Sequence, residues 1–580
     1  MLRANDHKTL YLVDPWGHLG PKRRKLLDES WAGLFREHIL SVLPVHQIAP
    51  CYTDGFGRPT KEIYSSLGAL ILQQMHDLTD EETVAQFSFN MQWHYALDIS
   101  GESDEAKYMC TKTLWTLRHI VAEKGLDEEL FAVTTETLAK VFGVDTSKQR
   151  IDSVHIRSNM RRLGRICVFA QSIHNFLVNL KRQRRVIFDT IEGELTERYL
   201  TEKAMGCFSL VKPSETAKTL ETVSRDLFSL VERFRQNTQV KSLTTFGVLL
   251  RVLQDQCDFD TTAARLALKA AKEIPSASLQ NPSDPDAGYD AHKGQGYQVQ
   301  VMETYGDSPD VTIREKTLNL ITHVEVEPAH VSDVHALIPA LESTTERGLA
   351  PDEVLADSLY GSDENTQKAK EMGVDVISPV MGTPNEETLS LAAFPQTDTG
   401  KILACPQGHA PIKVKQGKKG VASVAFASEH CTVCPLQGRC PVKAGRKRHY
   451  LRFDLKALRI AGRRAREHTA EFKDKYRWRS GIESTFSEMD KKTGVKRLRV
   501  RGLSAVGCCA RLKAIGVNLF RASKVKRARG TLSAAPGTLA AAFHSIISVI
   551  KERFRNLWLR LGDIFCPVTE NTLYRLKSAA

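Results

Sequence analysis

Apolar residues recur at helical spacing through much of the first third of the chain. Between residues 59 and 142 they repeat every three or four positions, and Ile63, Leu67, Leu70 and Ile71 form one such stripe. This pattern predicts a small all-helical domain, for which a helix-turn-helix is one candidate arrangement. The residues before it show no clear period, and their prolines and glycines predict an irregular arm.

Short runs with alternating or continuous apolar residues predict strands further along the chain. Helical patterns lie between several of these runs, over residues 332–347 and from Ser362 onward. Strands alternating with helices favour an α/β core. A helical stretch over 172–274 separates the first strand from the others, and we interpret it as an insertion. The predicted strands cover 149–157, 296–302, 320–326, 353–357 and 376–379.

The last third of the chain begins with a glycine-rich segment that we expect to be irregular. Helical periodicity returns over 454–491 and 503–522, and a linker of small residues precedes a final amphipathic helix, 539–561. The expected organisation is an N-terminal arm (1–55), a helical domain (56–145), the first core strand (146–160), a helical insertion (161–285), the core continued (286–384), a Cys-rich insertion (385–450), C-terminal core helices (451–522), and a linker with the last helix (523–580).

Charge is distributed unevenly over the 580 residues. The formal net charge is +13, yet residues 441–530 hold 27 Lys or Arg against 7 Asp or Glu, so the remainder is net acidic. A local basic excess of this size favours nucleic-acid binding over a merely solvated helix face. The helical domain is different, because residues 51–150 contain 16 acids and 9 Lys or Arg. The sequence therefore leaves DNA binding and self-association as two alternative roles of the helical domain.

Composition narrows the class of protein further. Hydrophobic residues make up 42% and charged residues 26%, as in ordinary globular proteins. No apolar run approaches the ~18 residues that span a bilayer, and the start lacks a signal-peptide pattern. We therefore expect a cytoplasmic protein without a membrane partner, whose twelve cysteines are reduced.

Three carboxylates have a context that suggests chemistry. Asp152 lies inside a predicted strand, Asp357 ends an apolar strand, and Glu483 lies on a helix within the basic region. Two strand carboxylates facing a helix carboxylate form an oxygen cage suited to Mg²⁺ or Mn²⁺. Taken singly, the three have ordinary alternatives: a strand-end cap, a turn residue and a salt-bridge partner of Arg479.

The residues around these carboxylates resemble the DDE transposases of bacterial insertion sequences. The matching segments are Ile-Asp-Ser at Asp152, Leu-Ala-Asp-Ser-Leu-Tyr-Gly at Asp357, and the spacing Tyr476-x2-Arg479-x3-Glu483. These motifs occur in the family's order. The resemblance implies a ribonuclease-H-like core, with a mixed sheet flanked by helices, and two Mg²⁺ or Mn²⁺ ions held by the three carboxylates.

The same resemblance implies activity and partners. Water would nick double-stranded DNA at the element's terminal inverted repeats, and the freed 3′-hydroxyl would attack target DNA, with a homodimer or higher oligomer on the DNA. The expected signature lysine is replaced by Asp490, so its role passes to the next residues. A nuclease that cuts without joining, and an inactive DNA-binding regulator, are the alternatives. The residues implied to contact phosphate are Tyr476, Arg479, Lys491 and Lys492.

Four cysteines and a histidine cluster within 36 residues: Cys405, His409, Cys431, Cys434 and Cys440. A Cys-x2-Cys pair with further cysteines nearby is typical of structural Zn²⁺ sites. We expect one zinc ion here, with the histidine able to replace one thiolate. Unligated thiols are the alternative, and a redox role is disfavoured because no thioredoxin-like pattern surrounds the pair.

Overall fold

The computed structural model describes residues 2–9, 12–52, 59–201, 204–260, 265–383, 386–397, 399–416 and 421–530. The chain divides into two units, Met1–Val525 and Lys526–Ala580. The fold described below belongs to the first unit. The expected last helix, 539–561, lies outside the described residues.

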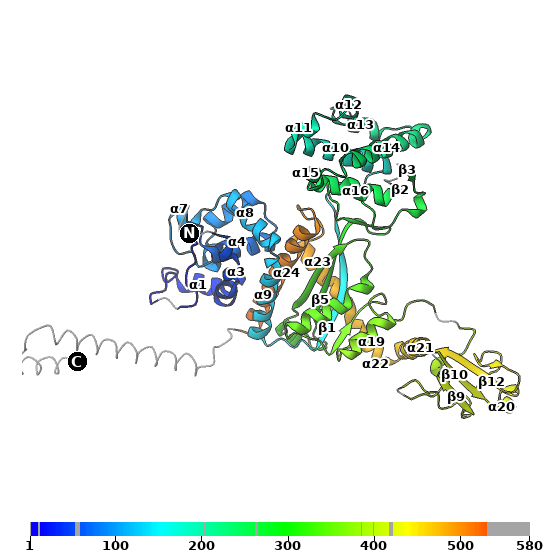
Figure 1. The fold of residues 1–580 in the computed structure, drawn as a ribbon. Coiled ribbons are helices and arrows are strands. Elements are labelled where there is room, and N and C mark those ends of the chain that lie inside the picture. Colours follow the sequence, from blue (N-terminus) through cyan, green and yellow to red (C-terminus); the bar gives the residue numbers. More distant parts are fainter. Residues whose placement is uncertain are drawn as a thin grey trace, which may run out of the picture. The chain divides into compact units, whose positions relative to one another are not determined.

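A six-stranded mixed sheet forms the centre of the first unit (Figure 1). The central strand β1 pairs antiparallel with β5 on one side and parallel with β7 on the other; β4 and β6 extend the sheet beyond β5, and β8 extends it beyond β7. The predicted α/β core is therefore confirmed. The strands are β1 (Lys148–Arg157), β4 (Gly288–Asp290), β5 (Gly294–Thr304), β6 (Ile321–Pro328), β7 (Glu353–Leu355) and β8 (Asp375–Ile377).

Helices cover both faces of this sheet. Side chains alternate along β1, so Ile151 packs on one face with α18 (Leu337–Glu346) and α19 (Asp363–Glu371). Val154 and Ile156 point to the opposite face, where they join the largest apolar core of the chain. Asp152 has the same parity as Val154, so its side chain belongs to that second face.

The second face is covered mainly by α24 (Leu503–Ala528). Asn518 on this helix exchanges two 2.9 Å hydrogen bonds with the backbone of Ile321, which satisfies polar groups of β6. A side chain at Gly516 would meet Met75 within 2.9 Å, so glycine permits the close approach of a neighbouring helix. By length and composition α24 is apolar enough to cross a membrane, but 78% of its apolar window is buried, as expected for a core helix.

The N-terminal helices pack on this same core. The expected irregular arm is wrong, because Trp16, Leu34 and Phe35 are buried with the helices that follow. Short helices divided by prolines produce no readable period. The helices are α1 (Pro21–Asp28), α2 (Trp31–Leu34), α3 (Val45–Ile48), α4 (Ile63–Met75), α5 (Asp80–Phe89), α6 (Met91–Ala96), α7 (Asp104–Lys107), α8 (Thr111–Glu123) and α9 (Leu126–Phe142).

His7 ties the start of the chain to this helical domain. Its ring lies 3.4 Å from Asp98 and 3.7 Å from Glu62, and its side chain is 3% exposed. Burial alone would lower the pKa of His7, but the two carboxylates outweigh it and raise the pKa to about 9. The protonated ring is thus favoured in the folded state.

This arrangement predicts a pH-dependent stability. A histidine with a raised pKa stabilises the fold fully below pH ~6.5, and the contribution of roughly 3 kcal/mol is lost as the pH rises through about 9. Denaturant unfolding from pH 6 to 9.5 should show this loss in the wild type and not in His7→Gln. The exposed His46 offers a control, since His46→Gln should keep the wild-type pH profile. An unchanged profile in His7→Gln would contradict the role given to this residue.

The segment after β1 has a core of its own, formed by residues between Leu163 and Leu279. Its helical prediction holds to Gln256, after which Phe259, Leu266 and Leu268 lie on a β-hairpin instead of a helix. Side chains of this core alternate with outward-facing ones in this stretch, and this period of two favours strands over a helix. The elements are α10 (Arg165–Gln183), α11 (Arg185–Phe188), α12 (Gly193–Leu200), α13 (Ala204–Ser209), α14 (Thr216–Phe234), α15 (Thr238–Lys241), α16 (Thr244–Gln256), β2 (Cys257–Asp260) and β3 (Arg265–Leu268).

The cysteine-containing segment is also more regular than expected. It contains a four-stranded antiparallel sheet in the order β11-β12-β10-β9, with apolar residues alternating along β10 and β12. The prediction of an irregular insertion over 385–450 is therefore wrong in its structure, because short strands among glycines give a weak signal. The elements are β9 (Lys413–Gln416), β10 (Val421–Phe426), α20 (Ser428–Thr432), β11 (Lys443–Ala444) and β12 (His449–Asp454).

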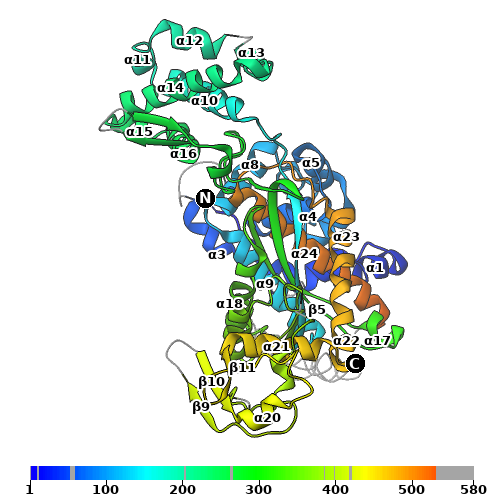
Figure 2. The same cartoon turned by 90° about the vertical axis from the view of Figure 1, so that its right-hand side faces the viewer.

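Two helices connect this small sheet to the central one (Figure 2). β12 runs directly into α21 (Leu455–Glu467), whose Arg459 makes two hydrogen bonds, of 3.0 and 2.6 Å, to Asp363 on α19. Arg463 on the same helix donates to the carbonyl of Gly361. The chain continues through α22 (Ala470–Tyr476), a 3-10 turn (Arg477–Ser480) and α23 (Gly481–Thr493), while the short α17 (Val311–Lys316) lies between β5 and β6.

Candidate active site

The pairing of two parallel strands brings Asp152 and Asp357 to the same level of the sheet. Arg150 on β1 is paired with Leu355, the last residue of β7, and each aspartate follows two residues later in the chain. One Asp357 carboxylate oxygen accepts hydrogen bonds from the backbone of Leu359 and Tyr360, which fixes the turn after β7. The register therefore brings the two aspartates to the same end of the parallel pair.

The electrostatics of Asp152 show that the third carboxylate is near. Burial raises the pKa of Asp152, Arg479 lowers it, and the negative charges of Asp357 and Glu483 raise it again, to about 6 in total. Like charges raise a carboxyl pKa in this way only over short distances. Asp152 thus interacts with the charges of both Asp357 and Glu483, and a cation beside Asp152 would relieve this repulsion.

Glu483 occupies the first turn of α23, and its side chain is exposed. The neighbouring Ile482 and Phe486 are buried in the largest core, which turns that face of the helix towards the sheet. Gly494 ends the helix in a left-handed conformation, with φ of 63°. The helix is therefore held firmly, while its first-turn carboxylate stays accessible.

A buried network that the sequence did not predict fastens α23 to the sheet. Glu303 on β5 is fully buried and accepts 2.8 Å hydrogen bonds from Arg150 on β1, Thr485 on α23 and Arg521 on α24. Arg150 also donates to the carbonyl of Trp478, just before α23. The two arginines outweigh burial and lower the pKa of Glu303. A glutamate within the apolar strand was the one available signal.

The residues implied to contact phosphate lie in different settings. Arg479 forms a 2.5 Å ion pair with Asp152, and Tyr476 stacks on Phe472 at 5.4 Å between ring centroids. Lys492 pairs with Glu488 at 2.7 Å, whereas Lys491 is exposed in the last turn of α23. Arg479 lowers the pKa of Asp152, and the pKa of Tyr476 is raised by burial and by the nearby charges of Asp357 and Asp152. The two lysines lie at the other end of the helix.

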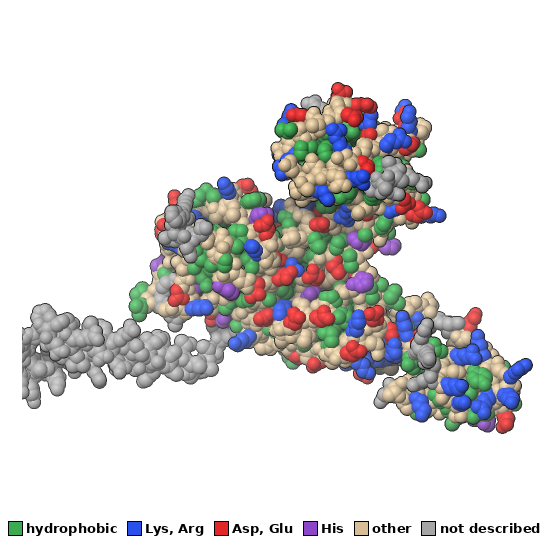
Figure 3. Space-filling model, viewed as in Figure 1, with side chains coloured by type: hydrophobic (Ala, Val, Ile, Leu, Met, Phe, Trp, Pro, Cys, Tyr) green, Lys and Arg blue, Asp and Glu red, His purple; other side chains and the backbone are tan. Residues whose placement is uncertain are grey.

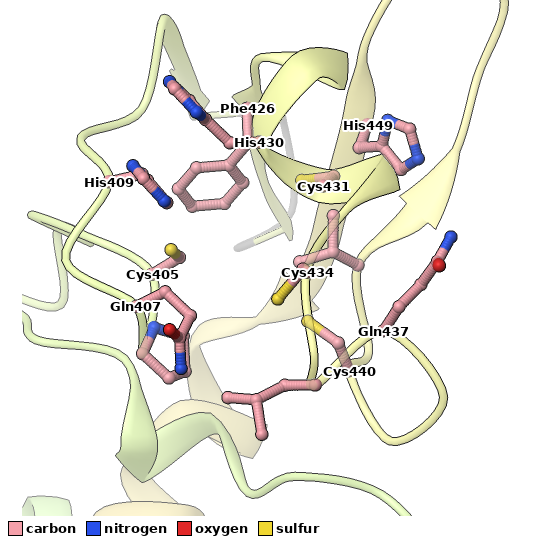
Figure 4. A pocket seen from close by; sticks show the side chains of 13 residues that line it. Cys405, Gln407, His409, Phe426, His430, Cys431, Cys434, Gln437, Cys440 and His449 are labelled. Carbon is pink, nitrogen blue, oxygen red and sulfur yellow. The ribbon is translucent and has the colours of Figure 1, made fainter.

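The five residues of the expected zinc site come together around one pocket (Figure 4). Cys434 and Cys440 bring their sulfur atoms towards one another, with Cys405 across the pocket and Cys431 on α20. Burial raises the pKa of the Cys431 thiol, and the three other cysteines raise it further. The fifth residue, His409, stacks on His430 with ring centroids 4.0 Å apart.

Neither the three carboxylates nor the cysteines with His409 lie as close together as the ligands of a bound metal ion. In the part of the chain that the structure describes, no three His, Cys, Asp or Glu side chains are gathered closely enough to hold a metal as they stand. The donors nevertheless suit two different ions. Carboxylate oxygens favour Mg²⁺ or Mn²⁺, and thiolates favour Zn²⁺.

Comparisons with known families identify two segments. Residues 25–119 match the family described as Transposase domain (DUF772), and residues 404–522 match Transposase DDE domain. The second match includes Glu483 and the cysteine pocket, and it begins after both aspartates. A search of the curated proteins finds no match. The two transposase domain matches together indicate a DDE-type transposase of an insertion sequence.

Proposed function

We propose that this transposase cleaves DNA at the ends of its element and joins the freed 3′-hydroxyl to target DNA, using Asp152, Asp357 and Glu483 as the ligands of divalent cations. The observation that supports this proposal most is the parallel register of β1 and β7, whose last pair, Arg150 with Leu355, lies two residues before Asp152 and Asp357. The pKa of Asp152, which the charges of Asp357 and Glu483 both raise after burial, supports it.

The central sheet supports a ribonuclease-H-like core. Its first strand is central, with antiparallel neighbours on one side and parallel ones on the other. The helical segment 161–285 and the cysteine-containing segment then act as insertions into that core. We assign the catalytic region to the described parts of 146–160, 286–384 and 451–522.

Each residue of the candidate site has a defined task. Divalent cations held by the three carboxylates would supply activation of water or a 3′-hydroxyl and stabilisation of the leaving oxygen. Arg479 neutralises Asp152, and its guanidinium is close enough to the carboxylates to bind a phosphate there. We further propose that Tyr476 at the end of α22, together with Lys491 and Lys492 further along α23, contacts the DNA backbone. We expect a homodimer or higher oligomer of the protein to bind DNA in the cytoplasm.

An assay with the element's inverted repeats tests this function. Purified protein, Mg²⁺ and a labelled duplex ending in one repeat are incubated with a supercoiled target plasmid. Transposition predicts both cut ends and joined products that carry the label in the plasmid. Cut ends without joined products would favour a nuclease, and binding without either product would favour a regulator.

For the cysteine pocket we propose one structural zinc ion held by Cys405, Cys431, Cys434 and Cys440. Thiol donors from three separate stretches of chain surround the pocket, and three of them pack against the small core of this segment. His409 is engaged with His430, so the four cysteines are the first choice as ligands. Zinc would stabilise a sheet that has few apolar residues of its own.

Metal analysis of the purified chain should find about one zinc per chain, and much less in Cys434→Ser, because three thiolates bind zinc more weakly than four. The exposed Cys51 provides the control, since Cys51→Ser should keep the full zinc content. A wild-type protein without zinc, after purification free of chelators, would contradict the proposal.

A further inference from the structure

The basic stretch that marks this sequence divides into two parts in the structure. Downstream of Asp454 many of its cations pair with acids elsewhere in the chain, as Arg466 does with Asp375 at 2.9 Å, Lys475 with Glu353 at 2.5 Å and Arg511 with Asp127 at 2.7 Å. These ion pairs hold helices to the core. Many of the Lys and Arg residues in this stretch therefore neutralise acids within the protein and do not form a surface for nucleic acid.

The cations of the small sheet are different. Seven Lys and Arg side chains line one groove there, and among the described residues none of the seven forms an ion pair. They line one groove of about 1050 Å³ in which no Asp or Glu takes part. These seven, which we call the basic face, are Lys413, Lys415, Lys443, Arg446, Lys447, Arg448 and Arg452.

Strand alternation explains why the cations gather on one side. Along β12, Leu451 and Phe453 point inward to the small core, and Tyr450 and Arg452 point outward to the groove. On β9, Val414 packs inward while its neighbours Lys413 and Lys415 point outward. The core and the cysteine pocket therefore lie under one face of the sheet, and the basic face is the other.

The strand register arranges this face in rows. Ser423 on β10 is paired with Lys415 on one side and Arg452 on the other. Ala425 lies between Lys413 and Tyr450, and Tyr450 is in turn paired with Lys443 on β11. Four strands at their usual spacing span about 14 Å. Cations at both edges and small residues in the middle form a surface that is open along its centre. Figure 3 shows Lys and Arg side chains gathered over this part of the molecule.

We propose that the basic face docks the sugar-phosphate backbone of duplex DNA, independently of base sequence. Charge complementarity carries the inference, because duplex DNA presents one negative charge per about 1.7 Å of axis and unpaired Lys and Arg release its counterions. The span of the face is comparable to the roughly 12 Å major groove, so both edge strands reach phosphates. This proposal rests on the proposed function and assigns the cysteine-containing segment a role in holding DNA.

The test is a salt titration of DNA binding by the full chain. A fluorescent 30-bp duplex is used, once with an element end and once with unrelated sequence, between about 50 and 200 mM KCl. The variant carries four neutral substitutions on the basic face: Lys413→Gln, Lys415→Gln, Arg448→Gln and Arg452→Gln. The control carries the same charge change at exposed sites of the helical segment: Arg182→Gln, Lys218→Gln, Lys241→Gln and Lys272→Gln.

The basic-face variant should bind both duplexes more weakly, by at least tenfold at the higher salt, and its log–log salt slope should fall by about 3 to 4. The control should keep the wild-type slope. Circular dichroism and zinc content should match the wild type in both, which separates lost contacts from lost folding. Unchanged affinity and slope in the basic-face variant would overturn the proposal, as would an equal loss in the control.

Two further readouts keep this inference separate from the catalytic proposal. Binding does not require cleavage, so a chain that binds through the basic face and never joins DNA would refute the transposition chemistry alone. An acidic polypeptide, polyglutamate, is titrated in parallel. Loss of polyglutamate binding with full retention of DNA binding would assign the face to an acidic protein and overturn the DNA proposal.

Discussion

Asp357→Asn is expected to lower strand cleavage at the element ends by on the order of a thousandfold while DNA binding stays within twofold of the wild type. Removing one carboxylate removes part of the negative charge that holds divalent cations, and these supply several kcal/mol of transition-state stabilisation. The amide keeps the side chain's shape and its ability to accept the backbone hydrogen bonds of Leu359 and Tyr360. Cleavage is measured in single-turnover gels and binding by anisotropy.

Asp352→Asn provides the matched control. Asp352 is an exposed acid five residues earlier, at the start of β7, and only its backbone pairs with neighbouring strands. The same substitution there should leave cleavage unchanged. Asp152→Asn and Glu483→Gln should behave like Asp357→Asn, and full cleavage in any of the three would remove that residue from the site.

The second large effect is on stability. Glu303→Gln is expected to lower the free energy of unfolding by roughly 3–5 kcal/mol, because it leaves Arg150 and Arg521 buried without their shared counter-charge. The amide keeps one accepting oxygen where the carboxylate offers Thr485 two, so the attachment of α23 to the sheet, and with it the position of Glu483, is weakened. Denaturant unfolding measures the first effect, and single-turnover cleavage in Mg²⁺ measures the second.

Glu315→Gln is the control for charge alone, since Glu315 is exposed on α17. It should change stability by less than about 0.5 kcal/mol. A Glu303→Gln protein as stable as this control would contradict the role assigned to the buried network. Loss of cleavage with normal stability would instead show that Glu303 acts on the position of Glu483 and not on the fold.

Strong, local patterns in the sequence were the ones that predicted the structure well. The alternation along 149–157 and 320–326 corresponds to β1 and β6, and Ser362 caps α19 through the backbone of Asn365. The three candidate carboxylates each lie within a short motif, which is why the sequence singles them out. Their proximity depends on strand pairing, which the motifs imply only through a family resemblance.

Features that depend on distant partners were missed for physical reasons. The N-terminal arm has no period because Trp16 and Phe35 are buried by helices that come later in the chain. The small sheet was missed because its strands are short and rich in charge. The network around Glu303 could not be predicted, because its two arginine partners lie 153 and 218 positions away in the sequence.

The charge pattern was interpreted too simply from the sequence. The basic excess over 441–530 predicts a single nucleic-acid footprint, yet Arg466 and Arg511 neutralise acids within the protein. The sum of charges cannot distinguish a paired arginine from an unpaired one. Only the fold separates the internal ion pairs from the basic face on the small sheet.

The central claim is that Asp152, Asp357 and Glu483 together hold divalent cations beside DNA. It is tested most directly by a Mn²⁺ titration of the full chain bound to element-end DNA, followed by electron paramagnetic resonance. Asp152→Asn, Asp357→Asn and Glu483→Gln should each weaken Mn²⁺ binding by about tenfold or more, while Asp352→Asn binds like the wild type. Equal Mn²⁺ affinity in all four variants would contradict the claim.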